Sequence, residues 1–320
     1  MEADEVIVAR LRAGAWVSGE ELARELGISR AAVGKRVGSL RERGFAIEAR
    51  ARRGYRLRAL PDSLEPAMLA PLLQTKWVAR TLEWHERCGS TNDRAAERAR
   101  AGAPHGLCVI AEAQERGRGR VGRQWFSPSR KNIYLSLVVR PPLAPMALPP
   151  LALAVGLAAH ETLHASGVAV DLKWPNDVLA RGRKLGGILI EMSSELSRVS
   201  FAVIGVGINV NLAAADIPES LAPIATSMAI ESGRTFDRAE VTARLLGAIE
   251  RRYEEFEQHG PAPAARAFRE AARATLGRRV RVAADRELEG IAETIGDDGR
   301  LILRDDSGQA HSIVAGEVLL

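Results

Sequence analysis

One short stretch of this chain combines arginine and glycine in a way that suits phosphate chemistry. Residues 117–125 read GRGRVGRQW, and with Arg116 in front of them four arginines are interleaved with three glycines. Glycine lets a backbone approach a ligand closely and point N–H groups at it, and guanidinium groups pair with phosphate oxygens. The stretch predicts a loop for a nucleoside triphosphate or an acyl phosphate. A mobile surface loop or a second nucleic-acid contact are the alternatives.

The first six residues of this stretch also spell G-x-G-x-x-G, the pattern of a dinucleotide-binding turn. Such a turn follows a strand, opens a helix and meets an acidic residue about 20 positions later. A strand-like run does precede it, but RQWFSPSRKN, which follows, contains Pro128 and has no helical period. Arg140 and two prolines stand near the position where the acidic residue is needed. The context therefore argues against a dinucleotide-binding fold.

A second motif, HETLH at 160–164, matches the zinc-protease pattern H-E-x-x-H. The segment around it is rich in Ala and Leu, and imidazole near the C-terminal end of a helix complements the helix dipole. We interpret HETLH as part of a buried helix. The two cysteines, Cys88 and Cys108, show no metal-ligand spacing, so no metal site and no disulfide framework are predicted.

The elements that must position the Arg-Gly stretch alternate between two patterns. Strand-like runs lie at 81–93, 106–114, 132–141, 168–180, 182–193 and 200–211. Helix-like runs lie at 94–103 and 148–167. Residues 278–318 read as four short strands with DDG and DSG turns, typical of a small β domain. The expected fold class is α+β, with a mixed sheet dominated by hairpins.

Charge is concentrated at the start of the chain. Residues 1–60 hold 13 Lys and Arg against 8 Asp and Glu, which accounts for the whole net charge of +5. A basic segment attracts polyanions, of which nucleic acid is the commonest, although a solvated basic face gives the same count. This asymmetry makes a nucleic-acid contact a hypothesis that local patterns must test.

Those local patterns favour a winged helix-turn-helix. Ser18 and Glu21 form an S-x-x-E capping box for one helix, and Ser29 is the expected N-cap of the next, whose residues Val33, Val37 and Leu40 share one face. After it, residues 45–60 read as a hairpin suited to serve as the wing. Gly34 and Gly38 are unusual in the second helix, since each costs about 1 kcal/mol relative to Ala. They predict either close approach to a backbone or a weakened helix.

Four segments in order resemble the motifs of biotin protein ligases: GRGRVGRQW at 117, KWPNDV at 173, KLGGILIE at 184 and GVGINVN at 205. GSTN at 89 and Gln114 add to the likeness. With SGEELARELGISRAAVGKRV in front, the chain is similar from about residue 4 to 318 to the bifunctional bacterial ligases that also repress the biotin operon.

The resemblance implies a two-step reaction. Biotin carboxylate attacks the α-phosphate of Mg-ATP, and one lysine of a biotin carboxyl carrier protein then attacks the biotinyl-adenylate. The implied biotin-binding residues are Ser90, Thr91, Asn92, Gln114, Gly117, Arg118, Gly119, Arg120 and Lys184. The implied contacts to ATP or the adenylate are Arg118, Arg120, Arg123, Trp125, Asn176, Lys184 and Asn209.

The resemblance assigns catalytic roles to three residues of these sets and to Asp177. Arg118 and Arg120 would compensate charge in the adenylation transition state, and Lys184 would contact the biotin carboxylate and then the α-phosphate. Asp177 would orient or deprotonate the acceptor lysine. Taken singly, each motif has an ordinary alternative: a turn after Pro175, a surface lysine or a buried strand.

Three features depart from the family pattern. Val121 stands where some relatives have arginine, no tryptophan follows Asn211 to cover an adenine, and no basic tail follows Val318. These departures leave the number of phosphate contacts and the cover of the nucleotide open.

The resemblance also implies operator DNA as a partner and a homodimer, because two-fold operators require two-fold proteins. The expected DNA contacts are Ser29, Arg30, Lys35, Arg36, Arg52 and Arg53. We expect three domains: a winged helix-turn-helix over 1–60, a ligase domain over 66–270 and an SH3-like β domain over 276–320.

The acidic N-terminus lacks the basic flank of a signal peptide, and the longest apolar stretch, from Met146, is short and broken by Pro149 and Pro150. A cytoplasmic protein with no membrane partner is therefore expected. Three alternatives stay open at this stage. They are a ligase whose N-terminal domain no longer binds an operator, a ligase-inactive biotin-sensing transcription factor, and a lipoate-type protein ligase on a related fold.

Overall fold

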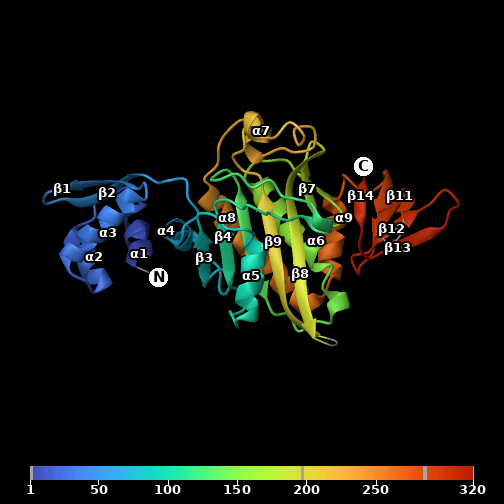
Figure 1. Cartoon of the computed structure of the whole chain (residues 1–320), viewed down its shortest axis with the longest axis horizontal. Helices are drawn as coiled ribbons and strands as arrows, with labels where there is room; N and C mark the ends of the chain where they lie inside the picture. The colour runs from blue at the N-terminus through green and yellow to red at the C-terminus, as the bar shows by residue number, and fades with distance from the viewer. Residues whose placement is uncertain (1–2, 196–197, 284–286, 320) are drawn as a thin grey trace. The chain divides into compact units, whose positions relative to one another are not determined.

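The structure, a computed structural model, describes residues 3–195, 198–283 and 287–319 (Figure 1). The chain divides into two compact units, one of Met1–Leu73 with Asp237–Ala243 and the other of Gln74–Phe236 with Arg244–Leu320.

The first unit contains a helix-turn-helix followed by a two-stranded hairpin. Its elements are α1 (Ala3–Leu11), α2 (Gly19–Leu26), α3 (Arg30–Glu42), β1 (Ala46–Arg50), β2 (Gly54–Ala59), α4 (Pro66–Leu69) and the 3-10 turn η1 (Ala70–Leu72). The expected capping box is present, because the Ser18 side chain accepts from Glu20 N at 3.1 Å and Ser18 N donates to Glu21 at 3.3 Å. Val33, Val37 and Leu40 are buried, as their spacing predicts.

One helix of this unit was not expected. The first helix start that the sequence predicts is at Ser18, whereas α1 precedes it and buries Ile7, Val8 and Leu11 completely. Its apolar positions fall on one helical face. A helix of nine residues is marginal alone, so α1 depends on packing against α2, α4 and β2.

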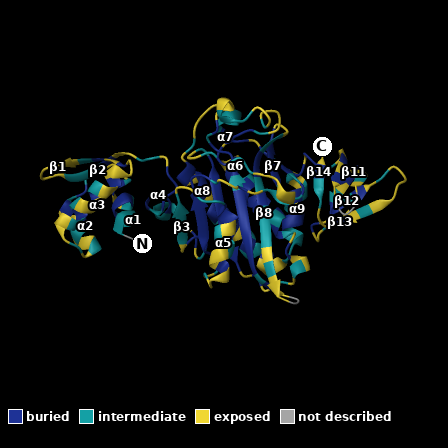
Figure 2. Ribbon diagram, viewed as in Figure 1, coloured by how far each residue is buried: buried dark blue, intermediate teal, exposed yellow. Residues whose placement is uncertain are grey.

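The core of the second unit is a seven-stranded sheet in the order β3-β4-β5-β9-β8-β7-β6. The strands are β3 (Leu82–His85), β4 (Cys108–Ala111), β5 (Ile133–Val139), β6 (Asp171–Lys173), β7 (Asp177–Ala180), β8 (Arg183–Glu195) and β9 (Arg198–Ile208). Only β3 and β4 pair in parallel; the other neighbours are antiparallel, which confirms the mixed sheet dominated by hairpins. Every residue of β5 is buried, and Figure 2 shows the central strands dark blue.

Helices cover both faces of this sheet. The helices from Thr91 onward are α5 (Thr91–Arg100), α6 (Leu151–Ala165), α7 (Met228–Ser232), α8 (Arg238–His259) and α9 (Ala262–Ala271), with the 3-10 turns η2 (Arg120–Gly122), η3 (Pro145–Ala147) and η4 (Ala214–Asp216). In Figure 1, α5 lies in front of the sheet, against β4, β5 and β9, and α6 lies behind it, against β6, β7 and β8. The helix-like run expected at 94–103 therefore starts earlier, at Thr91.

The C-terminal part of this unit is a separate antiparallel sheet in the order β13-β12-β11-β10-β14. Its strands are β10 (Arg279–Ala283), β11 (Glu287–Ile295), β12 (Leu301–Arg304), β13 (Ala310–Ile313) and β14 (Glu317–Leu319). The expectation of four strands was wrong, because the last three-residue strand pairs with β10 across the sheet. So short a run carries no alternation that the sequence alone could reveal.

Helix α6 contains the HETLH motif. The two imidazoles stack with centroids 6.1 Å apart, and burial lowers the pKa of His160 below its ordinary value. Among the residues that the structure describes, no group of three or more His, Cys, Asp and Glu side chains could hold a metal ion. The segment Pro145–Ala165 is long and apolar enough to cross a membrane by composition, but 67% of its most apolar window is buried inside the protein. Its burial is what a core helix of a folded domain shows.

Candidate active site

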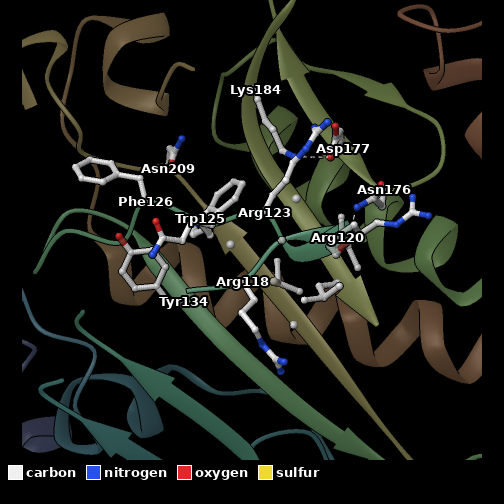
Figure 3. Close-up of a pocket in the computed structure, with 18 of the residues that line it drawn as sticks. Arg118, Arg120, Arg123, Trp125, Phe126, Tyr134, Asn176, Asp177, Lys184 and Asn209 are labelled. Carbon is white, nitrogen blue, oxygen red and sulfur yellow. Dashed lines mark hydrogen bonds and ion pairs between the residues drawn. The ribbon is translucent and has the colours of Figure 1, made fainter. Parts of the chain in front are cut away.

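A cavity of about 240 Å³ lies where the Arg-Gly loop meets the sheet. The first turn of α5, the loop itself, β5, β8 and β9, residues 209–225 and Glu317 line it. The cavity therefore gathers segments from four of the motifs that the sequence singled out, and Figure 3 labels side chains from these motifs around it, together with Phe126 and Tyr134.

The Arg-Gly loop folds back on itself. Trp125 N donates to Gly117 O at 2.8 Å, and Gly119 N donates to Arg123 O at 2.7 Å. At the tip, Val121 has a φ of 54° and is 84% exposed. The two hydrogen bonds fix the base of the loop and leave its tip in solvent.

One end of the cavity is a polar network around Gln114. Its Oε1 accepts from Thr91 N at 2.9 Å and from Thr91 Oγ1 at 3.1 Å, and its Nε2 donates to Ser127 Oγ at 3.1 Å. A Cβ on Gly117 would lie 2.6 Å from Ser127 Oγ, so the backbone must be bare there. Ser90 is buried as the N-cap of α5 and does not line the cavity.

Asn92 is fixed by partners on both sides of its amide. Ser136 Oγ donates to its Oδ1 at 2.6 Å, and its Nδ2 donates to Glu191 Oε2 at 2.7 Å. A Cβ on Gly205 would come within 2.1 Å of Oδ1. The glycine of GVGIN therefore makes room for a polar side chain of α5, a role that the sequence did not reveal.

Trp125 lies flat over two strands of the sheet. A Cβ on Gly207 would be 2.7 Å from the indole, and one on Gly187 would be 3.5 Å from it. The indole N–H is buried and has no hydrogen-bond partner among the described residues. A buried donor without a partner costs free energy that a ligand acceptor can recover.

Lys184 and Asp177 form the charged end of the cavity. Lys184 Nζ lies 2.7 Å from Asp177 Oδ1 and 5.5 Å from the centroid of the Trp125 ring. The other oxygen of Asp177 lies 3.2 Å from Lys173 Nζ, which also donates to Val318 O at 3.2 Å. Lys173, the first residue of KWPNDV, was missed by the sequence analysis. Only the hairpin of β6 and β7 reveals that it faces Asp177.

Arg120 and Arg123 are bound to the C-terminal sheet. Arg120 donates to Asn176 Oδ1 at 3.2 Å and to Gly316 O at 3.0 Å, and Arg123 forms an ion pair with Glu317. Burial lowers the pKa of the Arg120 guanidinium, against the opposite effect of Asp177 and Glu317. Glu317 was also missed, since nothing in the sequence brings it to a loop about two hundred residues earlier.

Arg118 is placed differently from the other two arginines. Its Nη2 lies 2.7 Å from Asp93 Oδ1 and 2.8 Å from Glu191 Oε2. Figure 3 shows its side chain extending away from the pair of Lys184 and Asp177. Arg118 therefore contacts α5 and β8, whereas Arg120 and Arg123 contact the C-terminal sheet.

The two asparagines serve mainly to tie segments together. Asn209 donates to Thr226 O at 2.9 Å and accepts from Asn132 at 3.0 Å, while Asn176 donates to Ile188 O at 2.7 Å. Both line the cavity.

The missing tryptophan after Asn211 is replaced by aliphatic side chains. Leu212, Ile217, Leu221, Ile224 and Ala225 line the cavity there. Ile224 is 60% exposed, so this apolar wall has surface left to cover.

Comparison with known proteins identifies this arrangement. Residues 84–209 match the biotin/lipoate A/B protein ligase family, 5–56 match an HTH domain and 275–320 match the biotin protein ligase C terminal domain. The bifunctional ligase/repressor BirA of Escherichia coli (strain K12) is 34% identical over 321 residues, covering 98% of this chain and 96% of the relative. The chain belongs to the biotin protein ligase family.

Other members of the biotin protein ligase family agree with this assignment. The bifunctional ligase/repressor BirA of Bacillus subtilis (strain 168) is 39% identical over 249 residues, or 78% of this chain and 77% of the relative. A biotin protein ligase from Aquifex aeolicus, solved in complex with biotin and ATP, superimposes with a TM-score of 0.66 at 27% identity. The superposition covers 75% of the present chain and 98% of the Aquifex aeolicus chain.

In the HTH domain of this family member, the expected DNA contacts are all exposed. Ser29 is the N-cap of α3, accepting from Ala32 N at 3.2 Å. Arg36 forms an ion pair with Asp4 of α1 at 2.9 Å, so it is less free than Arg30 and Lys35 on the same helix. Arg52, at the tip of the hairpin, has a φ of 65°.

The two glycines of α3 are not required by packing. A Cβ on Gly34 would make an ordinary contact with Tyr55 Oη at 3.5 Å, and one on Gly38 would meet nothing within 4 Å. Packing inside this unit therefore does not compensate for the helix stability that the two glycines cost.

Proposed function

We propose that this chain is an ATP-dependent biotin protein ligase that also acts as a biotin-responsive repressor. The observation that carries the ligase half is one cavity lined by Lys184, Trp125 and the three arginines of the loop, in a member of this family. A flat indole with a free N–H suits an apolar ligand with a polar head, and the cations suit carboxylate and phosphate.

In the first step the biotin carboxylate oxygen attacks the α-phosphorus of ATP, and pyrophosphate leaves. Lys184 sits beside Trp125, where its charge favours the approach of the two anions and then stabilises the α-phosphate. Arg120 and Arg123 offset the negative charge of the phosphates. Thr91, Asn92 and Gln114 hold the polar head of biotin, with Ser90 supporting them as the buried start of α5.

In the second step the amine of an acceptor lysine attacks the carbonyl of the mixed anhydride, and AMP leaves. Asp177 orients this amine or takes its proton, since its carboxylate lies beside Lys184 at the same end of the cavity. The proposed acceptor is a biotin carboxyl carrier protein, in keeping with a relative named biotin–[acetyl-CoA-carboxylase] ligase.

Magnesium would enter with the nucleotide. Mg²⁺ prefers oxygen ligands and commonly uses substrate phosphates with one or two carboxylates. Asp177 already pairs with two lysines, so the phosphates would supply most of the ligands, with Asn176 and Asn209 nearby. The ion would neutralise the charge of the leaving pyrophosphate.

The regulatory half rests on the HTH domain and its exposed basic residues Arg30, Lys35, Arg52 and Arg53. We propose that α3 enters the major groove, that the β1–β2 hairpin contacts phosphates, and that two copies bind a two-fold operator. A cytoplasmic location follows from these partners.

Pyrophosphate release with ATP, Mg²⁺ and biotin tests the ligase, followed by mass spectrometry of an added biotin carboxyl carrier domain. We expect one lysine to gain the mass of biotin. Binding of biotin without pyrophosphate release would make the protein a sensor, and labelling of a lipoyl domain in place of the biotinyl one would make it a lipoate-type ligase. Retention of promoter DNA that depends on adenylate, in a gel shift, tests the repressor.

A further inference from the structure

Resting on the proposed function, we propose that Asp93 and Glu191 are positioning residues for Arg118. They hold its guanidinium at the exposed edge of the cavity, and this clamp retains the acyl-adenylate until an acceptor lysine arrives. Neither carboxylate was expected to matter from the sequence.

The contacts that carry this proposal come from three separate parts of the chain. Arg118 lies in the Arg-Gly loop, Asp93 in the first turn of α5 and Glu191 on β8. The Arg118 side chain is 41% exposed, and the two carboxylates are 51% and 38% exposed. The guanidinium therefore joins the loop to helix α5 and strand β8 at the border between cavity and solvent.

The Arg118 side chain depends on Asp93 and Glu191 more than the loop as a whole does. The base of the loop is closed by the hydrogen bonds of Gly117 and Gly119 described above, and the flanking glycines give the backbone wide conformational freedom. Without the two carboxylates, the Arg118 side chain would lose the ion pairs that hold it, although Arg120 and Arg123 would still attach the loop to the C-terminal sheet. Arg118 would then sample positions away from the cavity edge, and the ligand beneath it would be released more readily.

The clamp does not prevent Arg118 from contacting a ligand. A guanidinium has five N–H donors, and both carboxylates approach it at Nη2. Donors at Nε and Nη1 stay available for an anion in the cavity. Glu191 also accepts from Asn92, which lines the cavity, so the clamp is joined directly to the ligand-facing side chains.

Purified Asp93→Asn and Glu191→Gln variants of the full chain test this proposal. Each is loaded with adenylate made from biotin and ATP labelled in the α-phosphate, and release is followed after removal of free nucleotide. Because these ion pairs are partly exposed, we expect release about threefold to fivefold faster for each variant and about tenfold faster for the double variant. Labelling of bulk albumin lysines should rise in parallel with the release of adenylate.

Several controls separate positioning from a structural effect. Glu97→Gln breaks an exposed ion pair with Arg94 on the same helix and should release adenylate at the parental rate. Asp93→Glu keeps a carboxylate and should restore slow release. In an Arg118→Ala background, Asp93→Asn should add nothing, because its effect acts through Arg118. High salt should speed release from the parent more than from the double variant.

Failure of the inference differs from failure of the proposed function. If the parent forms adenylate and both variants release it at the parental rate, the clamp is refuted and the ligase stands. If Asp93→Asn speeds release equally in the Arg118→Ala background, Asp93 acts through α5 and not through Arg118, which also overturns the proposal. A parent that forms no adenylate refutes the ligase itself.

Discussion

Two regions of this protein are rich in arginine, and they hold their arginines in opposite ways. In the β1–β2 hairpin, Glu48 pairs with Arg50, Arg56 and Arg58 at 2.6–3.2 Å, all within ten residues of it. In the Arg-Gly loop, the partners of Arg118, Arg120 and Arg123 include Glu191, Asn176 and Glu317, which lie 56 to 194 residues away. The hairpin is a local assembly, and the loop is assembled by the tertiary fold.

Local partners in the hairpin and distant partners in the loop suit different functions. The hairpin arginines also lie around the indole of Trp16, with guanidinium carbons 4.8–5.4 Å from its centroid. This arrangement keeps a basic surface in place for a flexible polyanion without needing the rest of the chain. The loop instead connects α5, β8 and the C-terminal sheet, so its arginines can be positioned to within the tolerance that a reaction demands.

The largest effect should come from removing the charge of Lys184, which lies beside Asp177 and Trp125. Lys184→Ala leaves Asp177 beside Lys173 only and removes the cation next to Trp125. We expect both half-reactions to slow by about a hundredfold to a thousandfold, because a preorganised charge at the reacting phosphate is lost. Single-turnover adenylation and transfer rates measure this. Lys76→Ala, on an exposed side chain, is the matched control, and near-normal turnover of Lys184→Ala would contradict the role assigned to it.

A methyl group at Gly207 should disturb the loop region by displacing Trp125. In Gly207→Ala the new Cβ would lie 2.7 Å from the Trp125 ring, so the ring must move. Overpacking of this kind costs about 1–3 kcal/mol, which predicts kcat/KM for biotin lower by about fivefold to a hundredfold. Gly247→Ala on α8, where the nearest atom is a flexible arginine end at 3.9 Å, is the control. An unchanged kcat/KM in Gly207→Ala would show that Trp125 is free to relocate.

In the hairpin, removing one arginine should change DNA affinity without changing the ligase. Arg53→Ala deletes an exposed charge next to Trp16. We expect weaker binding to all sequences and a slope of log K against log salt that is smaller by about 1. Arg80→Ala, an exposed arginine in the other unit, should leave the slope unchanged. Loss of preference for one operator base would instead mean that Arg53 reads sequence.

The smallest effect tests the glycines of α3. Gly38→Ala meets no atom within 4 Å, so it should stabilise the helix by about 1 kcal/mol. Amide hydrogen exchange in α3 should slow by about fivefold as a result. If Gly38→Ala also weakens operator binding, the glycine serves close approach to DNA; if binding is unchanged, it simply weakens the helix.

Local patterns predicted much of the fold. Ser18 with Glu21 and Ser29 marked two helix starts, the helix-like run from Leu148 became α6, and the alternating runs became the strands of the main sheet. Elements without such patterns were missed. Helix α1 has nine residues and β14 has only three, so each depends on the neighbours that pack against it.

For the site, the sequence supplied the loop, Lys184, Asp177 and Gln114, because their motifs stand in a recognisable order. It did not supply Lys173, Glu191 or Glu317, which face the loop or Asp177 only through strand pairing and the docked C-terminal sheet.

Capping, alternation and turn chemistry act between residues that are close in the chain. The sequence alone therefore predicts local structure and the residue types that are available for chemistry. The pairing of each carboxylate with its arginine follows only from the tertiary structure. This pairing depends on contacts between segments up to 194 residues apart, and no local sequence pattern indicates that such segments lie close together.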